Sequence, residues 1–159
     1  MINSSFYKLL QDGMKIELGD HTFGKQEIIN FASKFDPQRF HISEEEAKDS
    51  HFGDLCASGW HTISIWMQKN VENGLDEMIR LTGYEGAPPV FGPSPGFKDL
   101  RWHLPVFVGD TITYSSTISG KSPHPKRPNW GRVMNQSHGI NQNGKLVLSM
   151  NGSVTLRTD

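Results

Sequence analysis

Residues 58–80 read SGWHTISIWMQKNVENGLDEMIR, and this stretch carries the longest helical pattern in the chain. Ser58 is a residue type that caps the start of a helix. Four apolar side chains follow it at a spacing of four residues, which places them on one face of a helix. They are Ile63, Met67, Val71 and Leu75. We therefore predict a helix from Ser58 to about Arg80, with this stripe buried against the rest of the protein.

Two shorter helices are predicted before the long one, after an irregular start. The apolar spacing of Gln26–Phe35 predicts a helix that ends before Pro37, because the residue before a proline disfavours the helical conformation. Ser43 opens a capping-box pattern and indicates a second helix from Glu44 to about Ser50. Residues 36–42 should then form an exposed connection between the two helices.

The chain after the long helix is rich in β-branched residues and turn residues. Residues 83–96 hold four Gly and four Pro and should form a loop. Four strands are predicted after it, and Asn143-Gly144 is a strong hairpin signal between the last two. An antiparallel sheet wrapped around the long helix would bury the apolar stripe, so we predict an α+β fold in one domain, residues 1–159. The strands are residues 97–104, 111–119, 132–140 and 146–156.

The charges and the cysteine count exclude several classes of function. A formal net charge of −1 argues against nucleic acid or a membrane surface as the main partner. A single cysteine and the lack of a signal-peptide pattern predict a cytoplasmic protein. The segment from Thr111 to Thr158 holds six basic residues and no acidic one, so the rest of the chain carries a net charge of −7. This asymmetry fits an anionic ligand or a partner subunit, and equally a chance arrangement of surface charges.

Three segments, in this order, carry a family resemblance. They are FDPQRFH at residues 35–41, HFGDLCASGWHTIS at residues 51–64 and DLRWHLPVFVGDT at residues 99–111. The chain resembles the MaoC-like dehydratases, the family of (R)-specific enoyl-CoA hydratases, from residue 26 to about residue 119. It departs from the family pattern at Pro37, Gln38 and Arg39, at Asp54, and at Ser58, where the family has histidine.

The resemblance implies a fold, an assembly and a reaction. The fold is the hotdog fold, in which a curved antiparallel sheet wraps a long helix, and the working unit is a homodimer or a higher homo-oligomer. The substrate would be an acyl thioester of CoA or of a carrier protein, as in fatty acid metabolism. The reaction would be hydration of an enoyl thioester or dehydration of a 3-hydroxyacyl thioester, with no metal or redox cofactor.

The resemblance also implies roles for particular residues. Asp36 and His41 would hold and activate a water molecule, and on a loop a spacing of five lets both side chains converge. Gly59, at the start of the long helix, would offer a backbone N–H group to the thioester oxygen and, lacking a side chain, would let the carbonyl approach closely. Ser58 and Ser64 would line the same site, and Trp60 would close the acyl pocket. Otherwise Asp36 caps a turn, His41 lies on the surface, and the others belong to an ordinary helix start.

Other interpretations of the same residues remain open. Metal binding would draw on four side chains, but their spacings do not fit a zinc site. Cys56 with His61 as its base would make a nucleophile, although Cys56 is better interpreted as a buried core residue. Lys121, Lys126 and Arg127, in a proline-rich loop between strands, would bind CoA phosphates or remain solvated. The rival functions are a hotdog acyl-CoA thioesterase and a non-catalytic acyl-thioester binding module. The four side chains considered above as metal ligands are His41, His51, Cys56 and His61.

Overall fold

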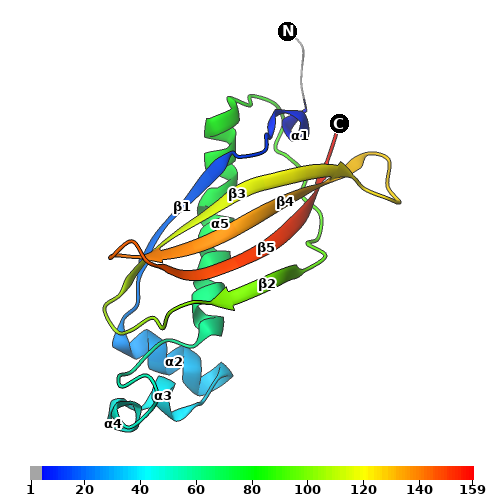
Figure 1. Cartoon of the computed structure of the whole chain (residues 1–159). Helices are drawn as coiled ribbons and strands as arrows, with labels where there is room; N and C mark the ends of the chain where they lie inside the picture. Colours follow the sequence, from blue (N-terminus) through cyan, green and yellow to red (C-terminus); the bar gives the residue numbers. More distant parts are fainter. Residues whose placement is uncertain (1–4) are drawn as a thin grey trace.

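One long helix and one antiparallel sheet form the body of the protein (Figure 1). The computed structural model describes residues 5–159. Helix α5 runs from Gly59 to Thr82, and a five-stranded sheet in the order β1-β3-β4-β5-β2 curves around it. The α+β architecture with a wrapped helix, the arrangement of a hotdog fold, is confirmed. The strands are β1 (Lys15–Thr22), β2 (Phe97–Trp102), β3 (Thr111–Pro123), β4 (Trp130–Asn141) and β5 (Leu146–Arg157).

The ends of α5 follow the capping rules that the sequence suggested. The Ser58 hydroxyl accepts a hydrogen bond from the Trp60 N–H, and Gly83 ends the helix in the left-handed conformation with φ of 63°. The β4–β5 hairpin turns at Gly144, whose φ is 71° and whose N–H donates to the Asn141 carbonyl. Residues 83–96 form the predicted loop between α5 and β2.

Only the two ends of the apolar stripe predicted on α5, Ile63 and Leu75, pack against the core, and the middle of the stripe is exposed. Met67 is 48% exposed and Val71 is 73% exposed. The sheet covers a neighbouring face of the helix, where small and polar residues allow close approach. At Gly74 a β-carbon would lie 3.6 Å from the Leu18 side chain, and the Asn73 side chain donates to the Leu18 carbonyl at 2.6 Å. The buried residues of α5 are His61, Thr62, Ile65, Trp66 and Gly74.

The start of the chain is more regular than the sequence indicated. Phe6–Leu9 forms α1, and β1 pairs with β3 along the edge of the sheet. Only Ile16 and Leu18 alternate inward before the register shifts at a bulge next to Gly19. Two apolar residues are too few for a clear strand pattern, so both elements were missed.

Three short helices gather at the N-terminal end of α5 (Figure 1). α2 (Lys25–Phe35) and α4 (Glu44–Lys48) confirm the two predicted helices, and Ser43 caps α4 by accepting from the Glu46 N–H. The connection between them was expected to be exposed, which holds for residues 37–39 and is wrong for His41. Arg39–Ile42 forms a one-turn helix, α3, and buries His41.

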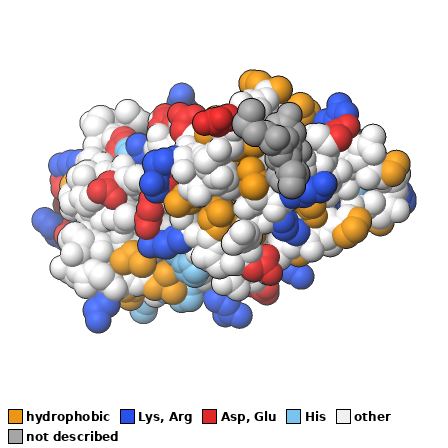
Figure 2. Space-filling view, turned by 90° about the horizontal axis from the view of Figure 1, so that it is seen from above, with side chains coloured by type: hydrophobic (Ala, Val, Ile, Leu, Met, Phe, Trp, Pro, Cys, Tyr) orange, Lys and Arg blue, Asp and Glu red, His pale blue; other side chains and the backbone are white. Residues whose placement is uncertain are grey.

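The surface charges are mixed on the face that Figure 2 shows. Lys and Arg side chains alternate there with Asp, Glu and hydrophobic side chains, and no wide field of one sign is visible. Among residues 5–159, no helix is long and apolar enough to cross a membrane.

Candidate active site

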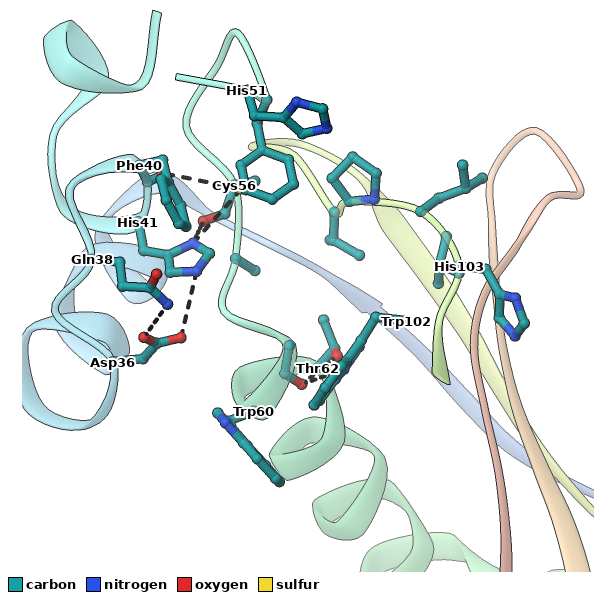
Figure 3. Close-up of a pocket in the computed structure, with 17 residues that line it drawn as sticks. Asp36, Gln38, Phe40, His41, His51, Cys56, Trp60, Thr62, Trp102 and His103 are labelled. Atoms are coloured by element: carbon teal, nitrogen blue, oxygen red, sulfur yellow. Dashed lines mark hydrogen bonds and ion pairs between the residues drawn. The ribbon is translucent and has the colours of Figure 1, made fainter. Parts of the chain in front are cut away.

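A cavity of about 520 Å³ opens at the N-terminal end of α5. Its walls come from the connection after α2, the segment that leads into α5, the first turn of α5, and the end of β2 with the loop that follows. Asp36, Gln38 and His41 lie on one side, and Trp60, Thr62 and Trp102 lie on the other (Figure 3). The structure therefore brings the predicted pair, Asp36 and His41, to one cavity together with Gly59 and Trp60.

The Asp36 carboxylate is held from two sides. Asp36 follows the last residue of α2, and its backbone N–H donates to the Ala32 carbonyl at 2.9 Å. Its Oδ1 accepts from the Gln38 side chain at 2.8 Å, and its Oδ2 accepts from the Ser58 hydroxyl at 2.6 Å. Partial burial opposes ionisation, but the hydrogen bonds from Ser58 and Gln38 and the nearby His41 outweigh it. The net effect lowers the pKa of Asp36, so the side chain is a carboxylate at neutral pH.

His41 is fixed by a backbone carbonyl. Its Nδ1 lies 2.7 Å from the Cys56 carbonyl oxygen, which can only accept a hydrogen bond, so Nδ1 carries the proton. The Cys56 N–H in turn donates to the Phe40 carbonyl at 3.2 Å, which ties the segment before α5 to α3. In the neutral imidazole, Nε2 then presents a lone pair. This nitrogen lies 3.5 Å from Asp36 Oδ2.

The pair therefore presents two hydrogen-bond acceptors to one point. A separation of 3.5 Å is longer than an ordinary hydrogen bond. A water molecule that donates one hydrogen to Asp36 Oδ2 and the other to His41 Nε2 would have its lone pairs directed away from both. Such a water is oriented for nucleophilic attack, and either acceptor can take its proton.

Gly59 is at the predicted place, but its missing side chain serves another purpose. A β-carbon at Gly59 would lie 2.4 Å from the Trp102 indole ring, and the indole N–H donates to the Gly59 carbonyl at 2.9 Å. The expected reason for glycine here, an approaching substrate carbonyl, is therefore not what occupies this space. Within residues 5–159, no acceptor meets the Gly59 N–H at the start of α5.

The three other residues that were predicted to line the site beside Gly59 lie in different positions. Ser58 is fully buried behind the cavity wall and contacts Asp36. Trp60 lines the cavity edge-on to Trp102, with ring centroids 5.3 Å apart, and is half exposed. Ser64 does not line the cavity: it is exposed, and its hydroxyl donates to the Trp60 carbonyl at 2.8 Å.

The predicted phosphate-binding residues lie away from this cavity. Lys121 belongs to β3, not to a loop, and its ammonium group donates to the Tyr7 carbonyl at 2.9 Å and lies over the Tyr7 ring. α1 packs near the C-terminal end of α5, where Phe6 contacts Tyr84. A 24-residue helix is roughly 36 Å long. Lys121 and the neighbouring Lys126 and Arg127 therefore do not converge on the cavity of their own chain.

The histidines and the cysteine of the competing interpretations lie in different surroundings. No group of three or more metal-binding side chains occurs within the described part of the chain. Burial, together with the carboxylates of Asp54 and Asp36, raises the pKa of the Cys56 thiol to about 11, so the thiol stays protonated. Its nearest imidazole is His41, with 3.7 Å between Sγ and Nδ1, and not the predicted His61. Cys56 is buried, as predicted for a core residue.

Several residues of the site were not predicted from the sequence. Gln38 was noted only as a departure from the family pattern, yet it holds Asp36. Thr62 lines the cavity while its hydroxyl donates to the Gly59 carbonyl at 2.7 Å. Trp102 comes from β2, and no sequence signal connects it with Gly59. The Cys56 carbonyl is a backbone group, which residue identity does not reveal.

Comparison with known proteins identifies related sequences and folds. Residues 9–136 match the family described as MaoC like domain. An uncharacterized protein of Bacillus subtilis, YdeM, is 40% identical over 57 residues, which is 35% of this chain and 40% of that protein. The match thus spans less than half the length of that relative.

Solved structures resemble the chain over nearly its full length. A MaoC-like dehydratase from Rhodospirillum rubrum is 32% identical, with a TM-score of 0.81 and 96% of each chain covered. A protein from Archaeoglobus fulgidus described as a monoamine oxidase regulatory protein is 31% identical, with a TM-score of 0.78, covering 99% of this chain and 97% of that one. The (R)-hydratase PhaJ1 from Pseudomonas aeruginosa is 20% identical, with a TM-score of 0.67 over 99% and 88%, which is a likeness of fold alone.

Proposed function

Because the chain belongs to the family of MaoC-like domains, we propose that it adds water to an enoyl thioester or removes it from a 3-hydroxyacyl thioester. One observation carries the proposal: Asp36 Oδ2 and His41 Nε2 face each other at 3.5 Å beside a cavity, with the Nδ1 of His41 already bonded to the Cys56 carbonyl. The structure of a MaoC-like dehydratase that is 32% identical to this chain supports the same reaction class.

The proposed addition begins with the water between Asp36 and His41. Its oxygen attacks the β-carbon of the enoyl thioester, and one O–H bond breaks as its proton passes to Asp36. The π electrons move towards the thioester carbonyl, whose oxygen gains negative charge. The α-carbon then takes a proton from the Asp36–His41 pair, so the overall reaction adds one water and leaves the enzyme unchanged. Dehydration is the same path reversed.

The start of α5 would stabilise the charge that develops during this step. The N–H group of Gly59 is unpaired among residues 5–159 and lies at the positive end of a 24-residue helix. Gly59 lines the same cavity as Asp36 and His41. A thioester with its carbonyl oxygen at Gly59 and its β-carbon at the water would satisfy both groups.

A hotdog thioesterase is the second candidate, because the same oriented water could attack the thioester carbonyl. Two acceptors around one water favour addition to the β-carbon. One group can take the proton of the water while the other helps return a proton to the α-carbon. The products separate the candidates: hydration preserves the thioester and yields a 3-hydroxyacyl group, whereas hydrolysis releases a free thiol. A non-catalytic binding module would do neither.

We also propose that two copies of the chain form the working unit. Trp60, Ser64, Met67 and Val71 lie on one stripe of α5 that the sheet of the same chain leaves exposed. β2 forms an edge of the sheet and exposes Phe97 and Trp102. A second copy that covers this edge and this stripe would bury both and narrow the half-open cavity. In that arrangement Ser64 would face the partner subunit.

The basic residues at the β3–β4 connection remain candidates for CoA phosphates only within such an assembly. Lys126 and Arg127 line a smaller hollow with His124 and Trp130. Desolvation lowers the pKa of His124, and the positive charges of Arg132, Arg127 and Lys126 lower it further. Replacing Lys126 and Arg127 with Ser should raise KM for CoA thioesters and leave pantetheine thioesters unchanged. Equal changes for both substrates would leave these residues as a solvated loop.

The proposal is tested by incubating the protein with enoyl-CoA thioesters of increasing chain length. We expect loss of the enoyl-thioester absorbance, a 3-hydroxyacyl-CoA product and no free thiol. Light scattering on the active sample should give the mass of at least a dimer. Free thiol without a hydroxyacyl product would replace the hydratase with the thioesterase, and binding without turnover would favour the non-catalytic module.

A further inference from the structure

We propose that Ser58 is a positioning residue, which fixes the Asp36 carboxylate relative to the first N–H group of α5. The sequence suggested contact with the substrate for Ser58, and the structure gives it a different place. This inference rests on the proposed function, because it assigns Ser58 the task of holding the water-activating group in register with the thioester oxygen.

Both hydrogen-bonding functions of the Ser58 hydroxyl are fixed. A carboxylate can only accept, so the single hydroxyl hydrogen points to Asp36 Oδ2, at 2.6 Å. The hydroxyl oxygen accepts from the Trp60 N–H at 3.2 Å. Ser58 is 0% exposed, so bulk water does not compete for either bond. The orientation of the hydroxyl is therefore set by two partners from different elements.

Ser58 thereby joins two parts of the site that are distant in sequence. Its carbonyl accepts from the His61 and Thr62 N–H groups, at 2.9 and 3.2 Å, which anchors its backbone in the first turn of α5. The next residue is Gly59, which carries the unpaired N–H. One bond from Ser58 thus ties the carboxylate to the helix end that would receive the thioester oxygen. Without it, Asp36 keeps only the side-chain bond from Gln38, which lies on its own connection.

The other groups around Asp36 cannot replace this bond. His41, from α3, is 3.5 Å away and leaves room for the water. The segment before α5 contributes the Cys56 thiol, which is bonded towards the Phe40 carbonyl, and Asp54, which is exposed and bears the same charge as Asp36. In Figure 3, His51 is drawn well apart from Asp36, beyond His41 and Cys56. Among residues 5–159, Ser58 is therefore the one side-chain donor that reaches Asp36 from the start of α5.

The test compares Ser58→Gly with Ser58→Thr. Glycine loses the hydroxyl but is tolerated as a helix N-cap, so the loss of the Asp36 bond is separated from the loss of the cap. Because hydrogen bonds to charged groups are strong, kcat should fall about 10- to 100-fold in Ser58→Gly with little change in KM. The acid limb of kcat/KM should move to higher pH, since Asp36 loses a donor that favours its charged form. Ser58→Thr should restore both.

Ser43→Gly is the matched control, because Ser43 also caps a helix and does not contact Asp36. It should leave the acid limb where it is in the wild type. If Ser58→Gly loses stability to the same degree as Ser43→Gly and keeps kcat and the acid limb, the positioning role is overturned and Ser58 is only a cap.

A second readout does not depend on turnover. With ¹³C-labelled aspartate, the Asp36 carboxyl resonance is assigned by its loss in Asp36→Asn and is titrated in each variant by NMR. The titration of Asp36 should move to higher pH in Ser58→Gly and return in Ser58→Thr. This shift in a protein that hydrates no enoyl thioester would support the Ser58–Asp36 link and refute the proposed function. Active protein with no shift would refute the link alone.

Discussion

Two histidines, His41 in α3 and His61 in the first turn of α5, are buried to the same extent, and their surroundings differ completely. His41 and His61 are each 5% exposed. His41 has a carbonyl on Nδ1 and a carboxylate near Nε2, and it lines a cavity. His61 stacks on the Phe31 ring at 4.5 Å and packs edge-on against Phe23, and its Nδ1 has no hydrogen-bond partner within the described residues.

The comparison shows that burial by itself does not identify a catalytic histidine. Desolvation lowers the pKa of His61, which keeps it neutral, and the nearby Glu27 only partly opposes this. Two aromatic rings, those of Phe31 and Phe23, pack against the His61 imidazole, and within residues 5–159 its Nδ1 is not bonded to any group that could take part in a reaction. His41 has a fixed tautomer, an adjacent anion and access to the cavity, and these three features are the ones expected of an acid–base site. The His61 region is thus expected to contribute to stability and the His41 region to turnover.

The largest expected difference in activity is between substitutions of the carboxylates in the two regions, Asp36 near His41 and Glu27 near His61. Asp36→Asn removes a proton acceptor and preserves shape, so kcat/KM for hydration should fall about 10²- to 10⁴-fold while the melting temperature changes little. Glu27→Gln is the matched change beside His61, where Glu27 Oε1 accepts from the His21 ring and the Gly24 N–H. It should retain turnover. Near-normal hydration in Asp36→Asn would remove Asp36 from the mechanism.

The next effect compares the histidines directly. His41→Ala should lower kcat about 10²-fold, because the water loses one of its two acceptors. His61→Phe should keep kcat within about twofold, since a ring of similar shape still stacks on Phe31. Steady-state rates for both variants, with folding checked by circular dichroism, measure this difference in kcat. Equal losses of activity in both would mean that burial, and not the surroundings, sets the effect.

A smaller effect is expected on the cavity wall, where Trp102 packs over Gly59. In Gly59→Ala the new β-carbon would overlap the indole ring, so the free energy of unfolding should fall by about 1–3 kcal/mol unless Trp102 moves. In a protein that already carries Trp102→Ala, adding Gly59→Ala should lower the free energy of unfolding only a little, because the indole ring is no longer there. Chemical denaturation of the four proteins gives the coupling energy. Simple additivity would mean that the two residues do not meet in solution.

The sequence predicted what depends on local pattern and on family motifs. The long helix with its Ser58 cap and the hairpin at Asn143-Gly144 follow from residue types at short spacing, whereas the convergence of Asp36 and His41 was implied by the resemblance to the family. The bond from Ser58 to Asp36 joins residues 22 positions apart, and the contact between Gly59 and Trp102 joins residues 43 apart. Contacts of this kind depend on how α2 and β2 meet the end of α5, which no local spacing encodes.

The misplaced stripe on α5 has a similar cause. Apolar spacing identified a face that includes Met67 and Val71, but the sheet packs against Thr62, Trp66 and Gly74. A helix that is covered on two sides, by its own sheet and by a second copy, carries two such faces. A search for one apolar stripe finds only the more regular of them. The exposed face is therefore the one we assign to the partner subunit.

The smallest expected effect is the pH dependence of stability that His61 imposes. An unfolded histidine titrates near pH 6.5, and burial lowers the pKa of His61 in the folded protein. Between these two values the unfolded chain binds more protons, so the free energy of unfolding should decrease as the pH falls below about 6.5 and level off below the folded pKa. Asp36, whose pKa is also lowered, acts at more acidic pH, because an unfolded aspartate titrates near 3.9.

The contributions of His61 and Asp36 can be separated by denaturant unfolding between pH 4.5 and 7.5. In this range Asp36 stays charged in the folded and the unfolded protein, whereas His61 gains a proton on unfolding. His61→Phe should flatten the stability profile in this window, because the group whose protonation favours unfolding is gone. An unchanged slope in His61→Phe would mean that His61 is already solvated when the protein is folded. The contrast with His41 would then rest on the cavity alone.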